Sequence, residues 1–141
     1  MIRWRRDERG SAIVEFHFLG ILLLVPLVYV MLAVLDVQRA SYGVTQAARE
    51  AGRIYVATGD EVAARLAAQV ALTDQGLVGG PADIVLRCST APCYQPGAEI
   101  TVTVATTVNL PFLPEVLAGT VNAAIPVEAT HSSVVDRFRA L

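Results

Sequence analysis

The longest uninterrupted apolar stretch of this chain lies near its amino terminus. From Phe16 to Leu35, twenty successive residues carry no formal charge. A helix of that length spans about 30 Å, the thickness of a bilayer's hydrocarbon core. The pattern therefore predicts a transmembrane helix over residues 11–35. The stretch exceeds the roughly 7–15 apolar residues of a secretory signal and no small-residue cleavage site follows it, so ordinary signal-peptide removal is not expected.

Beyond Asp36 the apolar positions recur every three or four residues, which predicts that the helix continues to about Ala57 in amphipathic form. This stripe consists of Ala40, Val44, Ala47, Ala48, Ala51, Ile54 and Tyr55. Thr58-Gly59-Asp60 then supplies a stop and a new N-cap. A second helix is expected from about Glu61 to Gln75. Its inward-facing residues are predicted to be Val62, Leu66, Val70 and Leu77.

After the turn-rich residues 76–81 the apolar period changes from helical to alternating, which predicts strands. The first strand is expected to place Ile84, Leu86 and Cys88 on one face, and the clearest strand is Glu99–Val108, with Ile100, Val102 and Val104 inward. A third is expected near Val121–Thr130, with Ile125, Val127 and Ala129 together. Because Pro126 lacks an N–H, this strand should lie at a sheet edge or carry a bulge.

The predicted fold class is α+β. It combines one long amino-terminal helix, with a transmembrane half and an amphipathic half, a second helix and a small antiparallel sheet of about three strands. Between the second and third strands, residues 110–114 read as a loop packed by its own apolar residues. Alternatively, Phe112 and Leu113 form an exposed contact for another subunit.

Charge is distributed unevenly along the chain. Four arginines precede the apolar stretch, at positions 3, 5, 6 and 9, whereas only Arg39 and Arg49 follow it closely. The positive-inside rule therefore predicts a single-pass protein of the cell membrane, with a cytoplasmic amino terminus and an extracytoplasmic carboxyl-terminal domain. From Asp36 onward, seven arginines stand against ten acidic residues. That balance lacks the basic footprint that phosphate backbones require, so nucleic acid is not expected as a partner.

Glu15 is an acid at the start of an otherwise apolar helix. Entering hydrocarbon alone would cost a carboxylate a few kcal/mol, so it needs a partner. One interpretation makes Glu15 an interfacial acid that reaches the lipid headgroups. In the other, a cut between Gly10 and Ser11 creates an amino group four residues before Glu15, which neutralises the carboxylate within one chain or between neighbours.

The segment Arg9-Gly10-Ser11-Ala12-Ile13-Val14-Glu15-Phe16 resembles the cleavage region of type IV pilin-like proteins, and among them the TadE family. The resemblance implies that a prepilin peptidase cuts after Gly10, that Glu15 is the fifth residue of the mature chain, and that Phe16 is the aromatic residue that commonly follows. The chain then divides into a basic prepilin leader (1–10), a transmembrane helix (11–35) and an extracytoplasmic pilin-like domain (36–141). His17 and the late position of Pro26 depart from the family pattern.

Resemblance to this family also implies a function and partners. The function is that of a minor pilin or pseudopilin in the assembly of a tight-adherence (Tad-type, type IVb-like) pilus. The implied partners are a prepilin peptidase, the major pilin and other minor pilins, the inner-membrane platform of the pilus machine, and membrane lipid. The resemblance also implies incorporation into a surface pilus. The alternative is an uncleaved, signal-anchored membrane protein that presents a small binding domain.

Cys88 and Cys93 are the only cysteines, and an extracytoplasmic location makes a disulfide the expected state. A ring this small stabilises a fold by roughly 2 kcal/mol on the chain-entropy model. A redox pair and a pair of metal ligands are the alternatives. The spacing is not Cys-x-x-Cys, and only two scattered histidines are present to complete a zinc site.

No catalytic motif is recognisable in the chain. His131 has no nucleophile arranged around it by motif, and the sequence contains no Gly-rich phosphate loop and no His-Glu-x-x-His stretch. We therefore expect neither an enzyme nor a resident metal or cofactor, and no small-molecule substrate. An extracytoplasmic enzyme remains a third hypothesis, without a nominated residue.

Overall fold

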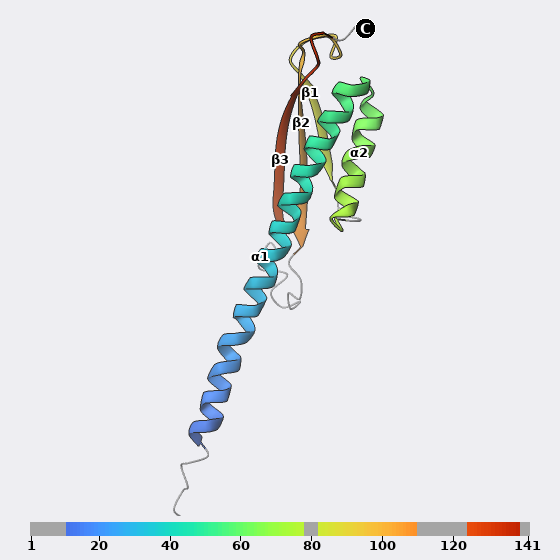
Figure 1. Ribbon diagram of the computed structural model, residues 1–141. Coiled ribbons are helices and arrows are strands. Elements are labelled where there is room, and N and C mark those ends of the chain that lie inside the picture. The colour runs from blue at the N-terminus through green and yellow to red at the C-terminus, as the bar shows by residue number, and fades with distance from the viewer. Residues whose placement is uncertain (1–10, 78–81, 110–123, 139–141) are drawn as a thin grey trace, which may run out of the picture. The chain divides into compact units, whose positions relative to one another are not determined.

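The protein is described by a computed structural model that covers residues 11–77, 82–109 and 124–138 (Figure 1). Its elements are α1 (Ser11–Thr58), α2 (Glu61–Asp74), β1 (Asp83–Cys88), β2 (Glu99–Asn109) and β3 (Ala124–Val134). This is the expected α+β class in a pilin-like layout. The chain forms two compact units, residues 1–34 and residues 35–141. The predicted loop at residues 110–114, with Phe112 and Leu113, lies outside the described residues.

The amphipathic half of α1 is the central element of the second unit. Its predicted apolar stripe is confirmed, because the side chains of Ala40, Val44, Ala47, Ala48, Ala51 and Tyr55 are all buried and belong to one core cluster. Ile54 is partly buried against that cluster. Four of the six buried residues are alanines, so the backbone of α1 can approach its neighbours closely.

The turn between the helices has the predicted chemistry. Gly59 adopts a positive φ of 73°, and its N–H donates to the Tyr55 carbonyl at 2.7 Å. Asp60 is the N-cap of α2, where its carboxylate accepts hydrogen bonds from the N–H groups of Val62 (2.8 Å) and Ala63 (3.2 Å). A cap of this kind stabilises a helix by about 1 kcal/mol.

The prediction for the buried face of α2 was wrong. Val62, Leu66 and Val70 are 76%, 59% and 53% exposed, and the buried residues are Ala64, Ala68 and Leu72. The two sets are offset by two residues, about 200° around a helix, so they lie on nearly opposite faces. The alanines face inward because α2 packs beside the alanine-rich α1, where small side chains permit a close approach. Leu77 is partly buried against the core, as predicted.

The sheet has the strand order β1-β2-β3 and is antiparallel throughout. Its inner face carries the predicted residues: Ile84, Ile100, Val102, Val104 and Val127 are buried, and Leu86, Cys88 and Ala129 pack partly against the core. β3 is an edge strand, as the proline in it required. It continues to Val134, beyond the predicted end at Thr130, and so includes His131 and Ser133 on the inner side.

The outer face of the sheet is rich in hydroxyl groups. The side chains of Thr101 and Ser132 lie 3.2 Å apart across β2 and β3, and those of Thr103 and Thr130 lie 3.0 Å apart. Both are directly opposed residue pairs in the ladder. Side chains of directly opposed residues on one face of a sheet lie close enough for such short polar groups to bind one another.

Gly52 lies at a close approach of α1 to β3. A Cβ atom at this position would lie 2.8 Å from the Ser133 Oγ and 3.6 Å from the Ser133 Cβ. In the structure Gly52 is the residue that lets the helix lie against the strand.

We therefore expect Gly52→Ala to destabilise the protein by about 1–2 kcal/mol, because the steric cost of overpacking exceeds the ~0.5–1 kcal/mol gained by replacing a helical glycine. In a Ser133→Ala background the same substitution should be neutral or stabilising, since the two remaining Cβ contacts, with His131 Cδ2 at 3.4 Å and with the Cβ of residue 133 at 3.6 Å, are ordinary ones. Chemical unfolding of the full chain in detergent, arranged as a double-mutant cycle, measures this coupling. Equal effects of Gly52→Ala in both backgrounds would contradict the close contact.

Candidate functional site

The first helical turns of α1 carry the site residues predicted from the sequence. The helix begins at Ser11, and Gly10 lies outside the described residues. Glu15 follows one turn later and Phe16 stands beside it, and both side chains are exposed. Within residues 11–77, 82–109 and 124–138, Glu15 makes neither a hydrogen bond nor an ion pair. It is therefore an acid available to a partner.

The helical spacing decides which partner is within reach. Four residues correspond to a rise of about 6 Å, so Ser11 and Glu15 lie one turn apart on the same face. Side chains of a helix lean toward its amino terminus, which points the Glu15 carboxylate toward the Ser11 backbone. The positive end of the helix dipole lies there too and favours a carboxylate. An amino group on Ser11 would complete a charge pair with this carboxylate, within the chain or between two chains.

Apolar side chains surround α1 in the first unit. The large apolar residues from Ile13 to Val34 are between 44% and 77% exposed, and none of the most apolar window of the helix is buried within the chain. Each such side chain forgoes roughly 1.5–3 kcal/mol of burial when it faces water. By length and composition the helix can cross a membrane, and it has the properties of a membrane anchor or of a signal sequence.

His17 and Pro26 lie inside this apolar helix. The His17 ring stands edge-on to Phe16, with 6.3 Å between ring centroids, and its Nδ1 lies 3.1 Å from the carbonyl oxygen of Ile13. Because a carbonyl only accepts, Nδ1 carries the proton in this contact. The histidine therefore has a hydrogen-bond partner within its own helix. Helix α1 is continuous through Pro26.

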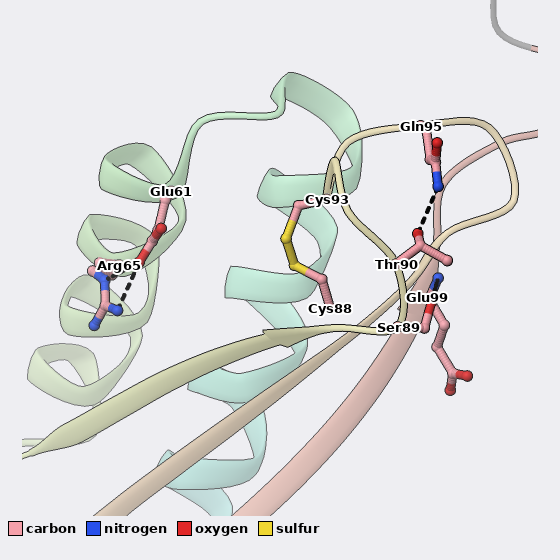
Figure 2. The surroundings of a disulfide bond; sticks show 8 residues. All are labelled: Glu61, Arg65, Cys88, Ser89, Thr90, Cys93, Gln95 and Glu99. Atoms are coloured by element: carbon pink, nitrogen blue, oxygen red, sulfur yellow. Dashed lines mark hydrogen bonds and ion pairs between the residues drawn. A yellow bond between two sulfur atoms is a disulfide. The ribbon is translucent and has the colours of Figure 1, made fainter.

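The predicted disulfide is present between Cys88 and Cys93, whose Cα atoms are 5.4 Å apart (Figure 2). It closes the loop that joins β1 to β2. The loop is also held by polar contacts: the Ser89 Oγ accepts the Glu99 N–H at 3.0 Å, and the Gln95 amide donates to the Thr90 hydroxyl at 2.7 Å. The cysteines therefore belong to a structural loop.

Tyr94 fixes this disulfide loop to the helices. Its ring lies 2.9 Å from the position that a Cβ atom on Gly59 would occupy, and it stands edge-on to Tyr55 with 6.3 Å between ring centroids. The loop, the α1–α2 turn and the core thus meet at one aromatic pair. Burial raises the pKa of the Tyr55 phenol, and the nearby Glu61 carboxylate raises it further.

A groove of about 640 Å³ runs between α1 and α2. On α1 it is lined by every fourth residue from Gln46 to Thr58, and on α2 by the exposed Leu66 and Val70 together with Ala63, Ala67, Ala71 and Asp74. Sequence reasoning missed this α1–α2 groove, because it assigned Leu66 and Val70 to the core. The alanine stripes that recur in both helices could have revealed it, because they predict small residues at the α1–α2 contact and larger residues outside it.

Chemistry-bearing clusters are lacking in the described part of the chain. No three His, Cys, Asp or Glu residues among residues 11–77, 82–109 and 124–138 gather in a way that could hold a metal ion. The ion pairs in these ranges, Arg53–Glu50 and Arg65–Glu61, are exposed and join neighbouring turns of one helix. The features that stand out are therefore surfaces: the apolar first half of α1 with Glu15 near its start, and the α1–α2 groove.

Comparison with protein-family models, with curated proteins and with solved structures found no match to this chain. The description of the layout as pilin-like is therefore supported by the fold alone. That fold consists of a long apolar amino-terminal helix, a second helix and a three-stranded antiparallel sheet packed on the long helix.

The raised pKa of Tyr55 predicts a loss of stability at alkaline pH. In the unfolded chain the phenol ionises near pH 10.0, whereas in the folded protein burial and Glu61 hold it neutral to higher pH. Its contribution to the free energy of unfolding is therefore complete below pH 10 and falls as the pH rises through the folded pKa.

The Tyr55→Phe variant keeps the ring but has no ionisable hydroxyl, so its free energy of unfolding should lack this pH-dependent contribution. The difference in unfolding free energy between the wild-type chain and Tyr55→Phe should be constant from pH 7 to 9 and should then shift against the wild type above pH 10. Denaturant titrations of the full chain in detergent across this range measure it. A difference that stays constant to the highest pH would show that Tyr55 is not held neutral by the fold.

Proposed function

We propose that this chain is a minor pilin or pseudopilin that takes part in the assembly of a Tad-type pilus. The observation that carries the proposal is the first part of α1, a predominantly apolar helix whose large aliphatic side chains are exposed and whose single acid lies one turn after its first residue. Such a surface needs lipid or other helices as its solvent. The pilin-like α+β layout, with a disulfide in the extracytoplasmic domain, supports the same interpretation.

In this role the apolar helix has two successive environments. It first holds the subunit in the cell membrane, with residues 1–10 in the cytoplasm and the domain from residue 36 outside. It then packs among neighbouring apolar helices in a filament or at its base. Because lipid and protein are both apolar, the transfer leaves the hydrophobic free energy of the helix nearly unchanged.

Glu15 supplies the polar part of the mechanism. A prepilin peptidase that cuts after Gly10 would leave an amino group on Ser11, one turn from the Glu15 carboxylate. In hydrocarbon each charge alone is costly, so the two are driven to pair. Pairing between neighbouring chains fixes the axial position of one helix against the next. The partners of such a step are the peptidase, the major pilin and other minor pilins, and the inner-membrane platform.

We expect the membrane-bound protein to begin at Ser11. Peptide mass spectrometry of the protein purified from membranes should recover Ser11 with a free amino group as the first residue, and Gly10→Ala should retain residues 1–10. A mature chain that still carries its first ten residues would overturn the pilin assignment and favour the uncleaved, signal-anchored binding protein.

Glu15→Gln should leave membrane insertion intact, because it removes the only acid from the apolar helix, and should lower assembly at least tenfold. The tenfold estimate is conservative, since breaking a buried charge pair costs about 3–5 kcal/mol. Glu128→Gln, which removes an exposed acid from the outer face of β3, is the matched control. The measurement is the ratio of this protein in the sheared surface fraction to that in the membrane fraction. Wild-type ratios in Glu15→Gln would rule out the charge-pair role.

A further inference from the structure

Two exposed apolar features of the second unit have no partner within the described chain. One is the α1–α2 groove, whose floor presents Leu66 and Val70 beside the partly buried Ile54. The other is Phe138, which is 96% exposed and is the most exposed large hydrophobic residue that the structure describes. Fully burying such a side chain stabilises by roughly 1.5–3 kcal/mol, so both features favour a contact.

The charges around the two features are complementary. Two carboxylates, those of Glu50 and Asp74, line the α1–α2 groove, and no arginine lines it. Arg53 forms a two-point hydrogen bond with Glu50 at 2.5 and 3.0 Å, which lowers the pKa of Glu50 and compensates much of its charge. Asp74 makes no ion pair within the described residues and is therefore the acid of the groove that a new cation would meet. Phe138, in contrast, directly follows Arg137 and precedes Arg139 in the sequence. An aromatic residue between two cations suits an apolar groove that carries the Asp74 carboxylate at its edge.

The backbone keeps Phe138 at the disulfide-loop end of its own domain. Val135 is held by two hydrogen bonds of 2.9 Å, from the Gly97 N–H to its carbonyl and from its own N–H to the Ala98 carbonyl. Three residues reach at most about 10 Å from that point. The Phe138 N–H also donates to Asp136 Oδ1 at 2.9 Å, which turns the chain. The 96% exposure of Phe138 shows that the groove of its own chain does not take it.

We infer that the α1–α2 groove receives Phe138 of a second copy of this chain, with the arginine before it facing Asp74. The two surfaces differ, so the contact is heterologous and can repeat from copy to copy, in a closed ring or an open helical array. A phenylalanine buries only about 150–250 Å², far less than the ~1,200 Å² of a stable interface. The contact therefore needs a raised effective concentration, which confining the copies to one membrane or filament would provide, and this step alone rests on the proposed function.

Photo-crosslinking of the full chain in lipid vesicles tests the inference. One copy carries p-benzoylphenylalanine in place of Phe138, and it is mixed with a ¹⁵N-labelled copy that lacks the probe. We expect adducts between light and heavy chains on the tryptic peptide of residues 66–87, which contains Leu66, Val70 and Asp74 and no internal arginine. Adducts only within one chain, adducts on other segments, or no adduct between copies would each overturn the proposal.

Matched substitutions in the heavy copy separate the groove from the rest of α2. Leu66→Glu should lower the adduct yield at least fivefold, whereas Gln69→Glu, which adds the same charge at an exposed position outside the groove, should not. Both positions are exposed, and circular dichroism checks that both variants fold. Equal yields in the two variants would contradict docking in the groove.

Charge reversal tests the polar part of the contact. Arg137→Glu in the light copy should lower the yield severalfold, and combining it with Asp74→Arg in the heavy copy should restore part of it. None of these measurements requires cleavage after Gly10. If crosslinking fails while the mature chain begins at Ser11, the contact between copies is disproved and the proposed function stands. If crosslinking succeeds while residues 1–10 are retained, the proposed function is disproved and the contact stands.

Discussion

The folded unit depends on the contact that the alanine-rich face of α1 makes with its neighbours. Ala40, Ala47, Ala48 and Ala51 are fully buried, and Gly52 lies against Ser133 of β3. Small side chains give up some apolar area but let backbones approach closely, which recovers dispersion contacts with the valines of β2. The same small faces on α2 leave its larger residues outside, so the core packing directly produces the exposed floor of the α1–α2 groove.

Much of this arrangement follows from local sequence rules. The α1 stripe, the Asp60 cap, the alternating residues of β2 and the Cys88–Cys93 bridge were all readable, since each is fixed by neighbours a few residues away. The inward face of α2 was not. Periodicity identifies two candidate faces on that helix, and the rule that large apolar residues lie inside selected the wrong one. Only the alanine surface of α1, distant in sequence, decides between them.

The candidate sites differ in the same way. Glu15 was identifiable because an acid in an apolar run is a local anomaly, and the structure adds the single turn that separates it from the start of the helix. The α1–α2 groove and the exposure of Phe138 depend on how distant elements pack, so no short sequence motif predicts them. Within the proposed role, the first feature acts among helices in an apolar medium and the second among domains in water. One subunit would then contact its neighbours at two separate levels.

The hydroxyl pairs on the outer face of the sheet have a consequence for how this surface meets solvent. Thr101 with Ser132, and Thr103 with Thr130, bind one another and still retain capacity for water. None of these four hydroxyls titrates in the physiological range, so the hydration that they provide persists through acid and through changes of ionic strength, independently of the Glu128 carboxylate on the same face. A polymer coated with such faces would remain wettable without depending on the net charge of its surroundings.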